Sequence, residues 1–264
     1  MKKHIKFSFF LLITAFALTS CEEVIDVDLN TTDPKIVIEG SVTDQTEPFK
    51  VSINKTVNFD QANEYPAVSG ALVTISDGTQ TFTLNETAPG VYKTSDAQKG
   101  EPGRTYHLRV EAEGQIFEAR SEMMALVKFD SLWQDKLNLG GQEAITVVPG
   151  YQDPLGLGNY YRFVLWRNGS ILSDIDVRDD KNSDGRTISQ PIFVLSEDLE
   201  VNDTIRVEMQ TIDKPIYKYF YALAASAGNG PNASVPGNPV SNLSGGALGY
   251  FSAHTSQEKT VIIR

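Results

Sequence analysis

Short runs of alternating apolar and polar residues cover most of the chain, and turn residues separate them. Lys35–Val42 and Gly70–Ile75 are rich in β-branched residues, and Asp77-Gly78 follows the second run. Residues 34–125 contain seven or so such runs and no sustained helical period, which is typical of short strands joined by tight turns. The pattern therefore predicts an antiparallel β-sandwich for this segment.

The pattern changes at about residue 126, and residues 126–264 are predicted to form a second β-rich domain. Tyr160–Trp166 is its strongest apolar run, and the hairpin dipeptide Asn168-Gly169 follows. Runs at 192–195 and 204–209 also predict strands. One short helix is expected near 213–228, because Asp213 can cap it, Pro215 suits its first turn and apolar residues recur with helical spacing.

The N-terminus has the three zones of a secretory signal peptide. Lysines are followed by the apolar run Phe7–Leu18 and then by Leu18-Thr19-Ser20-Cys21, which resembles a bacterial lipobox. Residues 1–20 are therefore expected to be a lipoprotein signal peptide, Cys21 the lipid-attachment site that labelled palmitate would mark, and 21–33 an acidic tether. Several acyl chains on one cysteine would anchor the protein permanently in a membrane.

Composition narrows the possible functions. Cys21 is the only cysteine among 264 residues, so a chain lipidated there has no disulfide and no thiolate ligand. The formal net charge of −11 becomes about −14 when the three lysines of the signal are removed. An acidic protein of this kind lacks the basic surface that nucleic acids require. We expect no nucleic-acid partner and no cofactor.

Two resemblances sharpen this interpretation. Val68–Ile75, Gly90-Val91-Tyr92 and Gly103–Leu108 resemble the transthyretin-like and carboxypeptidase-regulatory modules, which implies an Ig-like/transthyretin-like β-sandwich at 34–125. With the lipobox, Val37–Gly40 and Gly245–Phe251, the whole mature chain is similar to the Bacteroidota outer-membrane lipoproteins grouped as domain of unknown function 4249. These modules are generally scaffolds, and the family supplies no catalytic residues to transfer.

The family resemblance implies a location and a partner. Members look like accessories of TonB-dependent outer-membrane receptors in nutrient uptake, so we expect a lipid-anchored protein of the outer membrane. Glu22 and Glu23 directly follow Cys21 and favour exposure on the cell surface. A structural or assembly lipoprotein without a small ligand is the alternative, and a surface hydrolase is a third hypothesis.

One acidic segment is a weak calcium candidate. Asp180, Asn182 and Asp184 place oxygen ligands at alternate positions, and Gly185 follows. An EF-hand needs a bidentate glutamate at its twelfth position, where this chain has Pro191. A looser calcium site on a β-loop and a solvated acidic hairpin tip both stay open.

No catalytic signature is found, and we expect a non-catalytic protein. Apart from His4 in the signal, the histidines are His107 and His254, and no nucleophile elbow occurs. The functional surface is expected on the exposed helix face and the following Gly/Pro/Asn-rich loop, where binding sites usually occur. Aromatic groups such as Tyr160/Tyr161 could also form a stacking platform for a ligand. The candidate interaction residues are Tyr217, Tyr221, Asn232, Asn238 and Asn242.

Overall fold

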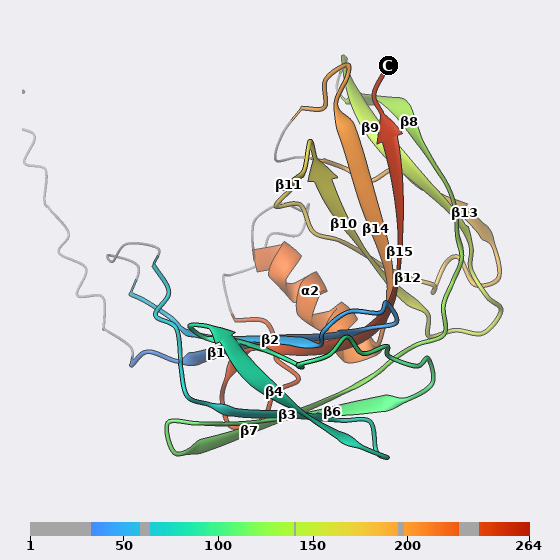
Figure 1. Cartoon of the computed structure of the whole chain (residues 1–264). Coiled ribbons are helices and arrows are strands. Elements are labelled where there is room, and N and C mark those ends of the chain that lie inside the picture. The colour runs from blue at the N-terminus through green and yellow to red at the C-terminus, as the bar shows by residue number, and fades with distance from the viewer. Residues whose placement is uncertain (1–32, 59–63, 140, 195–197, 227–237) are drawn as a thin grey trace, which may run out of the picture. The chain divides into compact units, whose positions relative to one another are not determined.

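The computed structural model describes residues 33–58, 64–139, 141–194, 198–226 and 238–264. The predicted signal peptide, Cys21 and the tether up to residue 32 lie outside these residues. Pro34–Arg264 forms one compact unit, drawn in colour in Figure 1. No described helix has the length and apolar character needed to cross a membrane.

The described chain is mainly β, as predicted, with a single helix. The elements of the first half are β1 (Ile36–Thr43), β2 (Lys50–Lys55), β3 (Leu72–Ser76), β4 (Thr81–Ala88), β5 (Val91–Lys93), β6 (Thr105–Ala112) and β7 (Gln115–Glu122). Those of the second half are β8 (Phe129–Leu139), β9 (Gln142–Gln152), β10 (Tyr160–Arg167), β11 (Ser170–Ile171), β12 (Asp176–Asp179), β13 (Thr187–Ser189), β14 (Thr204–Ile212), α2 (Lys214–Ser226) and β15 (Leu248–Ile262).

The first seven strands and the first part of β15 form a β-sandwich, because Phe251 and Ala253 of β15 belong to the same core. Buried and exposed positions alternate along β1 and β6, because successive side chains of a strand point to opposite faces. The inward residues form one core cluster that includes Ile38, Val73 and Tyr106. Gly40 lies where β1 meets β15, and a Cβ atom there would approach the Phe251 ring to 2.9 Å. This glycine lets the two strands pack closely.

Strand β15 connects the sandwich to the rest of the fold. Leu248–His254 pairs with β1 in parallel, and Thr255–Ile262 pairs with β14 in antiparallel. The boundary expected between 125 and 126 falls between β7 and β8, and one sheet path runs from β11 through β14, β15 and β1 to β7. Figure 1 shows β15 (red) as the continuous element of this path. The last strand therefore holds residues from both halves in one sheet.

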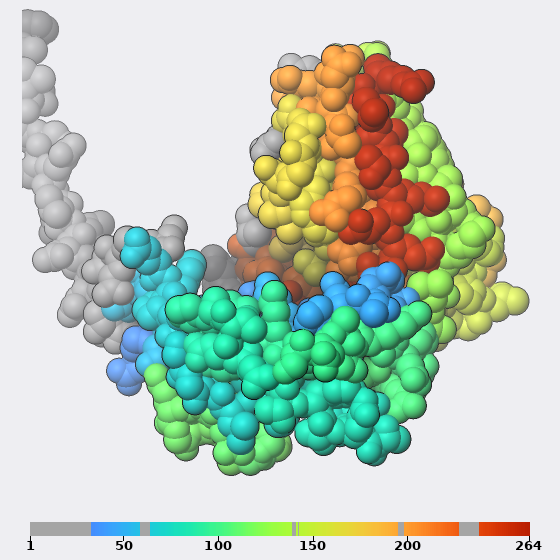
Figure 2. Space-filling view, viewed as in Figure 1, coloured from blue at the N-terminus to red at the C-terminus, as the bar shows by residue number. Residues whose placement is uncertain are grey.

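The second half builds its own core between two sheets. The hairpin β8–β9 and β13 form a three-stranded sheet, which packs against β10, β14 and β15. Tyr151, Tyr161 and Phe163 are among the buried aromatic residues of this cluster. In Figure 2 the surface of β15 (red) lies between those of β14 (orange) and β8–β9 (yellow-green).

In the second half of the chain, some of the predicted strands and turns are confirmed and one is not. Tyr160–Arg167 is a strand, and Asn168 (φ 51°) and Gly169 (φ 89°) form the expected hairpin turn into β11. The strand predicted at 192–195 is wrong for the described residues 192–194, where Ile192 makes one isolated bridge to Val147. Ile192 and Val194 pack into the second core, whereas Phe193 is 53% exposed, and beyond the one bridge these residues pair with no strand.

Candidate functional site

Helix α2 begins where the sequence predicted, because Asp213 caps it. The Ile216 N–H donates to Asp213 Oδ1 (3.1 Å), and the Ser121 hydroxyl (2.8 Å) and the Glu122 N–H (3.0 Å) donate to Oδ2. Burial raises the pKa of Asp213, and these hydrogen bonds oppose the rise. One carboxylate thus caps the helix and attaches it to β7.

Three tyrosines form a row beside this helix, and we call Tyr160, Tyr217 and Tyr221 the tyrosine ladder. Tyr160 and Tyr217 are half-buried and pack against the core beneath the helix. The Tyr160 and Tyr217 ring centroids lie 4.9 Å apart, and those of Tyr217 and Tyr221 lie 5.7 Å apart. Tyr217 and Tyr221 share a helix face because they are four residues apart. Tyr221 is 55% exposed, so the ladder ends in solvent.

The ladder borders a charged pair. The Tyr217 hydroxyl donates to Asp179 Oδ2 (3.2 Å), and Lys181 Nζ lies 2.8 Å from the same oxygen. Burial, together with the nearby Asp179 carboxylate, raises the pKa of Tyr217 to about 12. The hydroxyl therefore stays protonated at neutral pH, and the ladder presents its tilted rings beside the Asp179–Lys181 ion pair.

The predicted asparagines have different surroundings. Asn232 lies outside the described residues, and Asn238 is exposed. Asn242 is half-buried and acts as a strand substitute: its Nδ2 donates to the Phe251 carbonyl (2.8 Å) and the Arg120 carbonyl (3.2 Å), and its Oδ1 accepts from the Phe251 N–H (3.0 Å). Its amide is therefore used internally.

The acidic segment gains a member that the sequence did not indicate. Asp153, at the end of β9, lies beside Asp180 and Asp184, with one carboxylate oxygen of each within 4.8 Å of the others. This is the one such group of acids or histidines among the residues that the structure describes. Asn182, from the predicted set, is exposed. Asp153 is far from Asp180 and Asp184 in the sequence, so the spacing of the acidic segment gave no sign of it.

Backbone amides already contact this acidic group. The N–H groups of Gly158 (2.7 Å) and Asn159 (2.8 Å) donate to Asp180, that of Gly156 donates to Asp184 (2.7 Å), and the Tyr161 hydroxyl donates to Asp153. Burial raises the pKa of Asp153, and the neighbouring carboxylates add to the rise. Oxygen ligands of this kind suit a hard cation such as calcium, while the amide contacts already stabilise the charges.

The histidines do not form a catalytic arrangement with other described residues. His107 is exposed on β6, and His254 is buried on β15. Ser252 Oγ lies 3.0 Å from His254 Nδ1, but both residues are at most 5% exposed. A nucleophile must meet its substrate, so this pair is positioned for packing.

Comparisons with known proteins define a family. The family described as "Domain of unknown function (DUF4249)" matches residues 22–260. A search of curated proteins found no match. One solved structure, the alpha-L-rhamnosidase from Dictyoglumus thermophilum, is 10% identical with a TM-score of 0.24. The alignment covers 69% of this chain and 27% of the rhamnosidase, so this chain spans about a quarter of that protein's length.

Proposed function

The chain belongs to the DUF4249 family, and we propose that it is an outer-membrane lipoprotein that binds a TonB-dependent receptor as a non-catalytic accessory in nutrient uptake. The lipobox supports the anchor, and the family resemblance supports the receptor. Among structural observations, the tyrosine ladder carries the proposal. Tyrosine is enriched in protein interfaces because its ring buries a large area while its hydroxyl keeps a polar partner.

The ladder is suited to docking because it is fixed before a partner arrives. Tyr160 stands on a central strand, and Tyr217 is held by its ring contact and its bond to Asp179. Little side-chain entropy is left to lose, so more of the contact energy contributes to affinity. The exposed ring of Tyr221 would supply the central contact.

Co-purification after gentle detergent extraction tests the receptor role. The variant Tyr221→Ser should co-purify with at least tenfold less receptor, since a tyrosine that acts as an interface hot spot contributes about 2 kcal/mol or more. The matched control is Tyr65→Ser, because Tyr65 is 59% exposed but lies in the sandwich half. If both variants and the wild type recover equal amounts of receptor, the tyrosine ladder is not part of the interface. If the wild type recovers no receptor, the result favours the structural or assembly lipoprotein.

Lipidation is tested separately. Labelled palmitate should enter the wild-type chain and not Cys21→Ala, which should leave the membrane fraction. Equal labelling of the two proteins would contradict the anchor at Cys21.

A further inference from the structure

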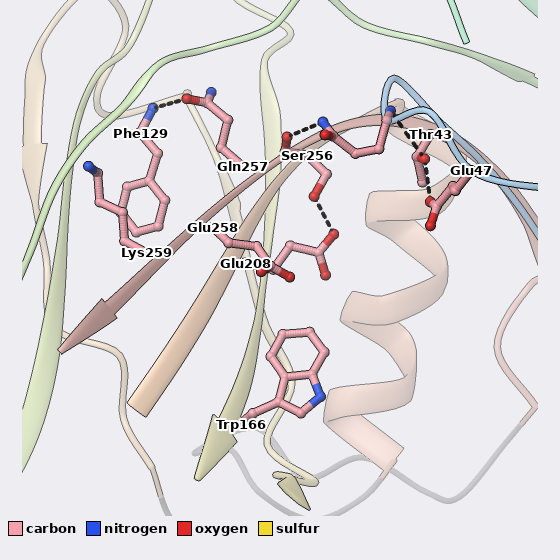
Figure 3. A pocket seen from close by; sticks show the side chains of 10 residues that line it. Thr43, Glu47, Phe129, Trp166, Glu208, Ser256, Gln257, Glu258 and Lys259 are labelled. Carbon is pink, nitrogen blue, oxygen red and sulfur yellow. Dashed lines mark hydrogen bonds between the residues drawn. The ribbon is translucent and has the colours of Figure 1, made fainter. Parts of the chain in front are cut away.

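A cavity of about 680 Å³ lies between the segment that follows β1 and the β14–β15 pair. Figure 3 shows its side chains from close by. Three carboxylates line it, from Glu47, Glu208 and Glu258, and the Trp166 and Phe129 rings form part of its wall. The cavity lies apart from the tyrosine ladder, with which it shares no lining residue.

Two of the carboxylates stand side by side. Glu208 and Glu258 are direct partners in the β14–β15 register, so their side chains leave the same face of the sheet. Like charges at such positions destabilise a sheet unless a cation neutralises them. Arg206 neutralises Glu258, with its Nη1 2.6 Å from Oε1, and its guanidinium lies 3.8 Å above the Trp166 ring.

Glu208 lacks a comparable counter-charge. Its Oε1 accepts the Ser256 hydroxyl (2.5 Å), and among the described residues no cationic nitrogen forms an ion pair with it. The Arg162 guanidinium attracts the Glu208 carboxylate electrostatically but forms no ion pair with it. Arg162 instead donates to Gln210 and lies over the Phe220 ring. Glu208 is half-buried, so water screens its charge less than at an exposed site. The second oxygen of its carboxylate can accept a donor from the cavity.

The other residues that line the cavity also favour a positively charged ligand. Glu47 accepts the Thr43 hydroxyl (2.5 Å) and has a second oxygen for a ligand. Lys259 is the one cationic side chain in the lining, and its Nζ lies over the Phe129 ring at 5.9 Å. Anions would meet three carboxylates here. An ammonium group carries three donors for carboxylate oxygens, and its charge is attracted to aromatic faces.

We propose that this cavity binds a primary ammonium group on an aliphatic stem, with the ammonium at the second carboxylate oxygen of Glu208. Arg206 already pairs with Glu258 and covers a face of Trp166, so these two residues line the site beside the ligand. The primary ammonium group occurs in free alkylamines and in the lysine side chain of a protein. This inference rests on the proposed binding function for its biological role. The predicted binding of an ammonium group depends only on the residues of the cavity.

Tryptophan fluorescence can report binding directly. The chain has two tryptophans, so Trp133→Phe leaves Trp166 as the reporter. In this background, 1,5-diaminopentane and N-acetyl-lysine amide are titrated at constant ionic strength, with 1,5-pentanediol as the neutral match and methyl glucoside as a saccharide probe. Saturable quenching by an amine is expected, and whichever amine binds identifies the source of the group.

Variants then assign the carboxylate. Glu208→Gln keeps the shape and should weaken amine binding at least tenfold, with Glu47→Gln as the second variant if the first lowers the melting temperature. The control is Glu143→Gln, an exposed glutamate of β9 that pairs with Lys136 outside the cavity. The proposal is overturned if neither amine quenches, if pentanediol or the glucoside binds as well, or if Glu208→Gln binds like wild type. Receptor co-purification is a separate measurement, so failure here leaves the proposed function standing.

Discussion

One buried histidine, His254 on β15, should make this fold less stable in mild acid. It is 5% exposed and lies opposite Thr43 of β1, with Ser252 Oγ near its Nδ1. Burial, assisted by the charge of Arg162, lowers the pKa of His254 to about 4, and Asp44 opposes the shift. The folded protein therefore keeps a neutral imidazole through the mildly acidic range.

The sign and size of this change in the free energy of unfolding follow from the difference in the pKa of His254 between the folded and unfolded chain. The unfolded chain binds a proton at His254 below about pH 6.5, and the folded chain does so only near about pH 4. Stability is therefore complete above the unfolded pKa and falls as pH drops through this window. At about 1.4 kcal/mol per pKa unit, the loss from about pH 7 to about pH 4.5 is about 2 kcal/mol.

Denaturant unfolding at the two pH values measures this loss. The variant His254→Gln should lose about 2 kcal/mol less than wild type over the interval. Its absolute stability is irrelevant, because only the pH dependence is compared. His107→Gln is the matched control, since His107 is exposed. An equal pH dependence in His254→Gln and wild type, or a His254 NMR signal that titrates near pH 6.5, would refute the reasoning.

Three further perturbations probe the fold and the acidic group. Asn242→Ala should cost about 1–3 kcal/mol because it leaves the Phe251 and Arg120 backbone groups unpaired, whereas the exposed Asn238→Ala should cost little in denaturant melts; similar costs would contradict the bridging role. Gly249→Ala should destabilise by more than about 2 kcal/mol, because φ is 92° and the new Cβ would lie 2.1 Å from the Ile38 carbonyl oxygen. Gly246→Ala at φ 80° meets nothing within 4 Å and should cost about 1 kcal/mol, so equal costs would mean that the clash is relieved. Micromolar calcium should leave the melting temperature unchanged, because a site without a bidentate ligand is expected to need about 10⁻⁴–10⁻³ M; marked stabilisation by micromolar calcium would show a tighter site.

Local features of the sequence determined the fold class and several elements. Runs of β-branched residues identified β1 and β3, because such side chains suit the pleated, half-buried surface of a strand. The turn at Asn168-Gly169 and the cap at Asp213 were also predictable, since each depends on the backbone preferences of neighbouring residues.

The tertiary structure alone decided what distant segments form together. The parallel pairing of residues 37–43 with 248–254 joins the two halves, and no local signal specifies a strand partner two hundred residues away. The same holds for Asp153 beside Asp180 and for the Glu208–Glu258 pair at the cavity. The sequence identifies residue 254 as a histidine but does not show that it is buried. Its lowered pKa depends on the strands packed around it. Side-chain chemistry is encoded residue by residue, but burial and neighbours, which set charge and binding, exist only after the chain has folded.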